Sequence, residues 1–234
     1  MDNLDAIATG IAKHLDEKDA LREQALTITR EMVRDSGEAI RNIHKGLCDE
    51  AAGRLENLIR SARHVTELLK DHGDLYHAGF TETAFQELVE MACVLAILKG
   101  EPLPEPQELC VTPTSYLLGL GDVIGELRRQ ALDALRKGDL EQADEDLQKM
   151  EAIYDCLIKF DYPSAMVPIR RKQDIARGLI EKTRGEVAVA AGNKKLEEKL
   201  DALRGFLDEA EGKKKPKEKK PSGEELDIDS VWKG

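Results

Sequence analysis

The sequence predicts an all-α fold, and three observations support this prediction. Leu, Ala, Glu, Lys and Arg are abundant, whereas aromatic residues make up only 4% of the chain, which is the composition of long helices. Apolar residues recur at intervals close to 3.6 through most of the chain. With 234 residues and 41% apolar content, the chain can bury one sizeable core. We therefore expect a single all-α domain over residues 1–211, followed by a flexible tail at 212–234.

The first third of the chain predicts two long amphipathic helices. Residues 1–15 are expected to be weakly ordered or to form a short leading helix. From 18 to 45, apolar residues at helical spacing alternate with arginines, and Gly46 is placed to end that helix. A second helix is expected over 49–70, where the apolar pattern stops before Gly73.

The middle of the chain is expected to supply the core helix. A helix over 81–99 is apolar on every side between Leu88 and Leu98, which is typical of a helix buried by its neighbours. The loop GEPLPEP follows, and its three prolines separate this helix from the next, over 113–136.

The last third of the chain predicts three further helices, which brings the expected total to seven. Gly138 and Asp139 indicate a turn followed by an N-cap, and the helix that begins there is expected to run to about Phe160. The segment DYPS interrupts the chain again. Two more helices are expected, over 165–190 and 193–211.

The charge distribution is uneven along the chain. A formal net charge of -11 argues against a general nucleic-acid coat, because non-specific binding depends on an excess of Lys and Arg. The segment 169–184 is an exception, with six basic residues against two acidic ones, and could form a basic inner face. The lysine-rich tail at 212–234 is expected to be a solvated linker; the alternative is a tail that adds electrostatic affinity for nucleic acid.

The cysteines and the apolar runs indicate a soluble, cytoplasmic protein. No CxxC pair occurs, so we expect neither a zinc site nor a disulfide framework, but reduced and mostly buried thiols. These cysteines are Cys48, Cys93, Cys110 and Cys156. The run LVEMACVLAIL has eleven residues and is too short to span a bilayer, which takes roughly 20.

Two pairs of acidic residues form the candidate functional site. Asp122 and Glu126 lie four residues apart in YLLGLGDVIGELRR, so both carboxylates sit on one helix face. Glu87 and Glu90 lie three residues apart in the most apolar segment, where burying an unpaired carboxylate costs several kcal/mol. Four carboxylates from two helices match the oxygen ligands that Mg²⁺ or Mn²⁺ prefers, and such a site suits phosphodiester hydrolysis.

The same acids have a structural alternative. Such spacings are common in charged helical proteins, and ion pairs to Arg128, Arg129 or the basic cluster at Arg170 would also stabilise buried carboxylates. No Glu-x-x-His motif accompanies the acids, which argues against a di-iron bundle.

Three glycines in the Asp122 helix each cost about 1 kcal/mol relative to Ala, so a neighbouring helix or a ligand is expected to approach that backbone closely. The prediction is sharpest for Gly125, where a larger side chain is expected to impair folding or cleavage.

Several motifs together resemble the translin family, and more specifically its archaeal members related to TRAX, the translin-associated factor X. They are REQALTITREMVRDSGEAIRNIHKG, FQELVEMACVLAILKG, YLLGLGDVIGELRRQALDAL and IYDCLIKFDYPSAMVPIRRKQDIARGLIEKTRGEV. They occur in the family's order and at its separations, and the similarity covers about residues 20–190.

The resemblance implies a subunit of roughly seven helices that assembles into a hollow homo-oligomeric barrel, typically an octamer, with RNA or single-stranded DNA inside. For the TRAX branch it implies an endoribonuclease that depends on Mg²⁺, with Mn²⁺ as a substitute. The implied metal-binding and catalytic residues are Glu87, Glu90, Asp122 and Glu126. The candidate nucleic-acid-binding residues are Arg34, Arg41, His44, Lys45, Arg170, Arg171 and Lys172. Taken singly, each of these fits a solvated or ion-paired surface residue better, and His44 also fits a C-terminal helix cap.

The leading hypothesis is therefore a Mg²⁺-dependent endoribonuclease that cleaves single-stranded or unpaired RNA inside a barrel. One alternative is a translin-like barrel that binds RNA or single-stranded DNA without cutting it. A less favoured one is an all-α nucleotide pyrophosphohydrolase, which also uses paired acids on bundled helices with Mg²⁺. The second pair here is DxxxE and not ExxD, and the flanking motifs fit translin better.

Overall fold

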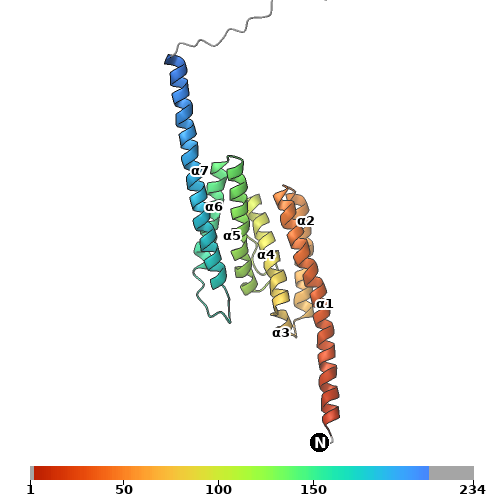
Figure 1. The fold of residues 1–234 in the computed structure, drawn as a ribbon. Coiled ribbons are helices and arrows are strands. Elements are labelled where there is room, and N and C mark those ends of the chain that lie inside the picture. Colours follow the sequence, from red (N-terminus) through yellow and green to blue (C-terminus); the bar gives the residue numbers. More distant parts are fainter. Residues whose placement is uncertain (1–2, 211–234) are drawn as a thin grey trace, which may run out of the picture. The chain divides into compact units, whose positions relative to one another are not determined.

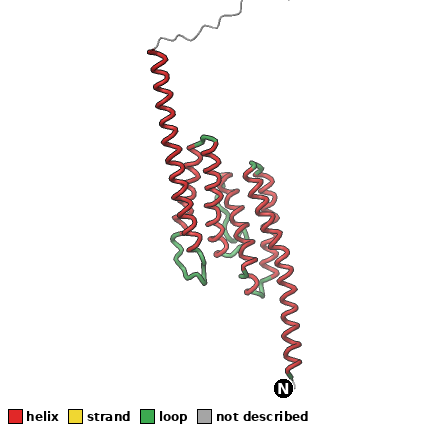
Figure 2. Tube along the Cα trace, viewed as in Figure 1, coloured by secondary structure: helices red, strands yellow, loops and turns green. Residues whose placement is uncertain are grey.

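The computed structural model describes residues 3–210, and every regular element in that part of the chain is a helix (Figures 1 and 2). The all-α prediction is therefore confirmed. The helices are α1 (Leu4–His44), α2 (Cys48–Leu68), α3 (Gly73–Tyr76), α4 (Gly79–Lys99), α5 (Pro113–Arg136), α6 (Leu140–Leu157) and α7 (Arg170–Ala210). The tail predicted at 212–234 lies outside the described residues.

The described helices number seven, as predicted, but two of the predicted boundaries are wrong. The leading segment is neither weakly ordered nor separate, because α1 begins at Leu4 and continues without a break. The two helices expected after residue 165 form the single helix α7, which runs through Gly192 and Asn193. No proline lies within either stretch, and a lone glycine costs a helix only about 1 kcal/mol, which flanking turns can offset. The short helix α3 was not predicted.

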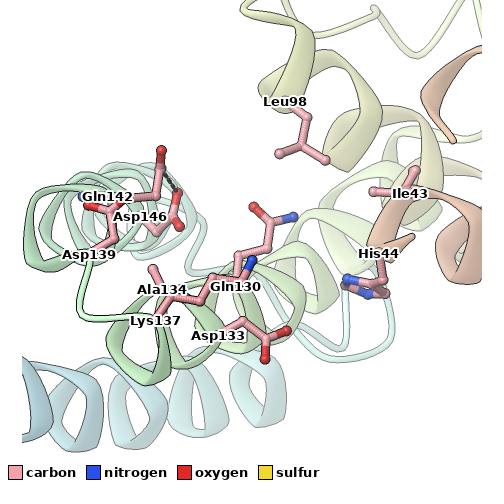
Figure 3. A pocket seen from close by; sticks show the side chains of 10 residues that line it. All are labelled: Ile43, His44, Leu98, Gln130, Asp133, Ala134, Lys137, Asp139, Gln142 and Asp146. Atoms are coloured by element: carbon pink, nitrogen blue, oxygen red, sulfur yellow. Dashed lines mark hydrogen bonds between the residues drawn. The ribbon is translucent and has the colours of Figure 1, made fainter. Parts of the chain in front are cut away.

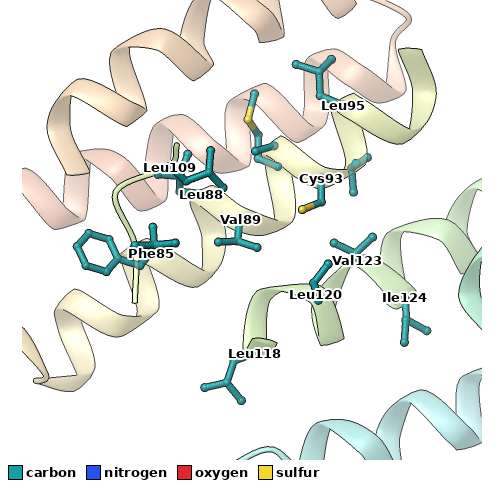
Figure 4. Packing of buried hydrophobic residues seen from close by; sticks show 14 of the residues in the cluster. Phe85, Leu88, Val89, Cys93, Leu95, Leu109, Leu118, Leu120, Val123 and Ile124 are labelled. Atoms are coloured by element: carbon teal, nitrogen blue, oxygen red, sulfur yellow. The ribbon is translucent and has the colours of Figure 1, made fainter. Parts of the chain in front are cut away.

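Helix α4 is the centre of the core, as its all-round apolar pattern predicted. It packs against α1, α2 and α5, and α5 packs in turn against α6. Phe85, Leu88 and Met91 are fully buried on α4. Val123 of α5 is fully buried facing α4, and Ile124 is fully buried on the other side of α5 (Figure 4). Because α4 is covered on several sides, any polar side chain on it that does not reach the surface must find a partner within the bundle.

Local sequence signals set the ends of the helices beside the core. Gly100 ends α4 in the left-handed conformation, with φ at 66°. Thr112 caps α5 by accepting a hydrogen bond from the backbone N–H of Ser115 at 3.0 Å. The Gly–Asp turn behaves as predicted: Gly138 has a φ of 79°, and Asp139 caps α6 by accepting from the Gln142 N–H at 3.1 Å. These ends fix which turns of α4 and α5 face each other.

The described residues divide into two units after Ala191, and α7 contributes to both. Within the first unit, α7 is tied to α5 by Arg128, whose guanidinium contacts the carboxylate of Glu186 at 2.8 Å and the hydroxyl of Thr183 at 2.6 Å. No described helix is long and apolar enough to cross a membrane.

The cysteines are free, as predicted, but only one of them is buried. Cys93 lies in the core on α4, where burial raises the pKa of its thiol to about 11. Cys48 and Cys110 are partly buried, and Cys156 is exposed. The prediction of mostly buried thiols is therefore wrong. A high pKa leaves Cys93 protonated at neutral pH and a poor nucleophile.

Candidate metal centre

The four predicted acids lie on the facing sides of α4 and α5. Glu87 and Glu90 are one turn apart on α4, and Asp122 and Glu126 are one turn apart on α5. All four side chains are partly buried. The two helices pack directly against each other, and Gly119 permits their close approach: a Cβ at that position would lie 2.7 Å from Cβ of Val89 and 2.8 Å from the Gln86 carbonyl oxygen. The structure therefore brings the two pairs together.

The pKa values of the α4 glutamates show that the acids interact. Burial and then repulsion by Asp122, Glu87 and Glu126 raise the pKa of Glu90 to about 8. Burial also raises the pKa of Glu87, and Asp122 and Glu126 raise it further. Nearby Lys172 lowers the pKa of both glutamates but does not cancel these effects. Burial is the larger cause of both shifts and the neighbouring carboxylates add to it, and pKa values raised in this way are common at functional sites.

Two basic side chains contact the α5 pair. The ammonium group of Lys172, at the start of α7, donates a hydrogen bond to the carboxylate of Asp122. Nε2 of His44, the last residue of α1, lies 2.5 Å from Oε2 of Glu126 in a second hydrogen bond. The ion-pair alternative is therefore realised in part, by lysine and histidine and not by an arginine.

Lys172 belongs to the basic cluster at Arg170, which the ion-pair alternative included, whereas His44 was not assigned to the acids from the sequence. His44 and Lys172 were predicted to contact nucleic acid, and Arg128, one of the expected partners, binds Glu186 instead. Lys172 lies 50 residues from Asp122 and His44 lies 82 residues from Glu126, so no local spacing could reveal either contact.

The donor set fits a hard divalent cation. It consists of carboxylate oxygens, which Mg²⁺ and Mn²⁺ prefer, and a cation would relieve the repulsion that raises the pKa of Glu90. In the arrangement seen over residues 3–210, however, no three His, Cys, Asp or Glu side chains are placed to hold a metal ion together. Because Asp122 and Glu126 are engaged by Lys172 and His44, a metal would have to compete with these two contacts.

The glycines of α5 differ in what surrounds them. A Cβ at Gly121 would lie 3.1 Å from Cβ of Lys172, so this glycine lets α7 approach the site, just as Gly119 lets α4 approach. A Cβ at Gly125 would meet no atom within 4 Å. Within residues 3–210, no neighbouring helix therefore packs closely on Gly125, and the alternative, a ligand that approaches there, stays a prediction.

The other predicted nucleic-acid contacts lie at the surface. Arg34, Arg41 and Lys45 are exposed near the end of α1, and Arg170 and Arg171 are exposed at the start of α7. Arg34 and Arg170 pair with neighbouring surface aspartates, whereas the other three make no ion pair with any residue in 3–210. Lys45 follows His44 directly and Arg171 precedes Lys172 directly, and both His44 and Lys172 touch the acid cluster. Lys45 and Arg171 are therefore next in sequence to residues of the candidate centre.

A polar cavity of about 280 Å³ lies next to the cluster (Figure 3). It includes His44 but none of the four acids. Asp146, on its far side, is only 1% exposed and accepts hydrogen bonds from Gln142 and Lys149, each at 3.1 Å. The remaining lining residues are Ile43, Leu98, Gln130, Asp133, Ala134, Lys137 and Asp139. His44 therefore stands between this cavity and the carboxylates.

Comparison with known sequences identifies one family. The sequence model of the translin family matches residues 11–185. An uncharacterised protein of Methanocaldococcus jannaschii is 35% identical over 192 residues, which cover 81% of this chain and 85% of that protein.

Solved structures with the same fold agree with this result. The crystal structure of AfC3PO is 34% identical and superimposes with a TM-score of 0.72, covering 80% of this chain and 97% of the other. A structure of AfC3PO in complex with duplex RNA gives a TM-score of 0.67 at the same identity and coverage. The more distant apo-NeC3PO, at 24% identity and a TM-score of 0.69, shares the fold.

Proposed function

The chain belongs to the translin family, and on that premise we propose that it is a Mg²⁺-dependent endoribonuclease that cleaves single-stranded or unpaired RNA inside a homo-oligomeric barrel. The observation that carries the proposal is the facing of four carboxylates on α4 and α5, with the pKa of Glu90 raised to about 8. A cation held between the two pairs would offset the repulsion among these acids, which supports the proposal.

Each acid has a role in this proposal. Glu87, Glu90, Asp122 and Glu126 would hold Mg²⁺ or Mn²⁺. When bound, such an ion lowers the pKa of a coordinated water and stabilises charge on a phosphoryl oxygen. His44 orients the Glu126 carboxylate through its hydrogen bond. Lys172, once released from Asp122, places an ammonium group where it can contact a phosphate.

A barrel reconciles RNA binding with the acidic composition. The net charge is -11, but only the inner wall of a shell needs to be basic. Arg34, Arg41, Lys45, Arg170 and Arg171 are the proposed phosphate contacts. The complex of AfC3PO with duplex RNA supports RNA as the partner. We further propose an octamer, as the family resemblance implies, and single-stranded DNA as a second possible ligand.

Cleavage of labelled RNA tests the catalytic proposal. Single-stranded and duplex RNA are incubated with Mg²⁺, or with a chelator, together with wild type, Glu126→Ala or Glu56→Ala. Glu56 is exposed on α2, away from the cluster, and provides the matched control. We expect wild type and Glu56→Ala to cleave single-stranded RNA only with Mg²⁺, and Glu126→Ala to be inactive. Equal activity of wild type and Glu126→Ala, or none in either, would refute the proposal.

Binding without cleavage is the alternative that one observation favours. Lys172 and His44 already contact Asp122 and Glu126, so both α5 acids have hydrogen-bond partners without a metal. A binding protein of this kind would retain RNA with steep salt dependence, and Mg²⁺ would not change its thermal stability. Thermal unfolding with and without Mg²⁺, measured beside the cleavage assay, separates the two functions.

A further inference from the structure

Four leucines form an exposed stripe on the last part of α7. Leu196, Leu200, Leu203 and Leu207 are 56%, 46%, 55% and 52% exposed, respectively. They are spaced by four, three and four residues, which is the alternation of a and d positions in a coiled-coil heptad. A helix with such a seam buries it against a second helix, and none in the described part of the chain covers it.

This stripe lies beyond the part of the chain that the family accounts for. The family match ends at residue 185, and the leucines belong to the unit that begins at Gly192. Helix α7 is continuous from Arg170 to Ala210, so the stripe is carried by a helix already nucleated within the bundle. Helix nucleation, the unfavourable step that makes short isolated helices marginally stable, is therefore not needed for this segment.

We propose that the end of α7, residues 192–210, pairs antiparallel with the same segment of a second copy of the chain. In this register Leu196 packs against Leu207 of the second copy, and Leu200 packs against its Leu203. The two-fold symmetry of the pair repeats both contacts. Each copy therefore contributes all four leucines to a short apolar seam.

The charges beside the seam determine the antiparallel orientation. Glu197 and Arg204 occupy positions that flank the leucines on the same side, and Lys199 flanks them on the other. In antiparallel pairing, Glu197 of each copy faces Arg204 of the other, which is attractive. In parallel pairing, Lys199 of each copy would face Arg204 of the other, which is repulsive. Such flanking charges set the orientation of coiled coils.

The composition of the segment also favours a protein partner over a lipid surface. Between residues 193 and 208, four basic side chains are balanced by four acidic ones. Helices that lie on anionic membranes carry an excess of Lys and Arg on their polar face. A balanced face instead suits pairing of opposite charges between two copies.

Disulfide trapping in the full-length protein tests both the pairing and its orientation. All variants carry Cys156→Ser, which removes the exposed native thiol. The double variant Glu197→Cys/Arg204→Cys reports the antiparallel arrangement, and Lys199→Cys/Arg204→Cys reports the parallel one. Residues 197 and 204 are about 10 Å apart along one helix, too far for a disulfide within a chain. We expect covalent dimers on a non-reducing gel for the first variant, at several-fold higher yield than for the second.

Two further variants control for chance collisions. Adding Leu200→Asp and Leu203→Asp to Glu197→Cys/Arg204→Cys should abolish the covalent dimer, while the thermal midpoint of the bundle stays unchanged because these leucines are exposed. The Cys156→Ser protein alone gives the background yield. The proposal is overturned if the first double variant gives no dimer above that background. Equal yields from the two double variants, or a dimer that survives the aspartates, would overturn it as well.

Discussion

Replacing Glu90 by glutamine is expected to stabilise the protein in the absence of metal. Burial and three neighbouring acids raise the pKa of Glu90 to about 8, so the folded chain binds a proton that the unfolded chain has released at neutral pH. Glutamine keeps the shape of the protonated side chain and needs no proton. The variant should therefore gain the free energy that wild type spends on protonating Glu90.

The size of this gain depends on pH. One pKa unit corresponds to about 1.4 kcal/mol, and the reference pKa of the glutamate is 4.5, so the cost at pH 7 is about 3 kcal/mol. The pKa is raised on folding, so the native state binds more protons than the unfolded state between about pH 4.5 and pH 8. Wild-type stability therefore falls as pH rises through that window. The advantage of Glu90→Gln should be about 1 kcal/mol at pH 5 and about 3 kcal/mol at pH 7.

Urea unfolding, followed by helical circular dichroism in the presence of a chelator, measures the effect at both pH values. Glu56→Gln makes the same chemical change at an exposed position of α2 and should alter stability by less than about 0.5 kcal/mol. If Mg²⁺ binds the cluster, adding it should stabilise wild type and not Glu90→Gln. A variant no more stable than wild type at pH 7, or a gain equal at both pH values, would refute the reasoning.

Four further predictions concern the surroundings of the cluster. Gly119→Ala should destabilise the fold by about 1–3 kcal/mol in urea titrations, because its Cβ would lie 2.7 Å from Cβ of Val89. Gly125→Ala, which meets no atom within 4 Å, should stabilise it by up to about 1 kcal/mol. Lys172→Met should lower the thermal midpoint of the metal-free protein, because the cluster loses its ammonium group. The increase in thermal midpoint on adding Mg²⁺ should then be larger than in wild type. An unchanged increase would contradict competition between the lysine and the metal. Arg171→Ala should reduce the slope of log RNA affinity against log salt by about 1, and an unchanged slope would mean that it contacts no phosphate.

The sequence predicted the helices well where the apolar periodicity was strong. It predicted them poorly where a single glycine was expected to end a helix. The apolar run of α4 identified the core helix, and prolines and the Gly–Asp turn placed the ends of α5 and α6. The break expected near Gly192 did not occur, since a single glycine removes too little helix stability to end a helix whose neighbouring turns are formed. The exposed start of α1 was underestimated for the same reason.

At the candidate site, the sequence by itself determined which side chains could share a face. The three-residue and four-residue spacings put Glu87 with Glu90 and Asp122 with Glu126, because helical periodicity is a local property. Whether the two pairs meet, and what contacts them, depends on how helices pack. Only the tertiary structure brought Lys172 to Asp122 across 50 residues and showed that Gly119, and not Gly125, accepts a neighbouring helix. Such contacts are fixed by the packing of distant segments, for which a single sequence carries no periodic signal.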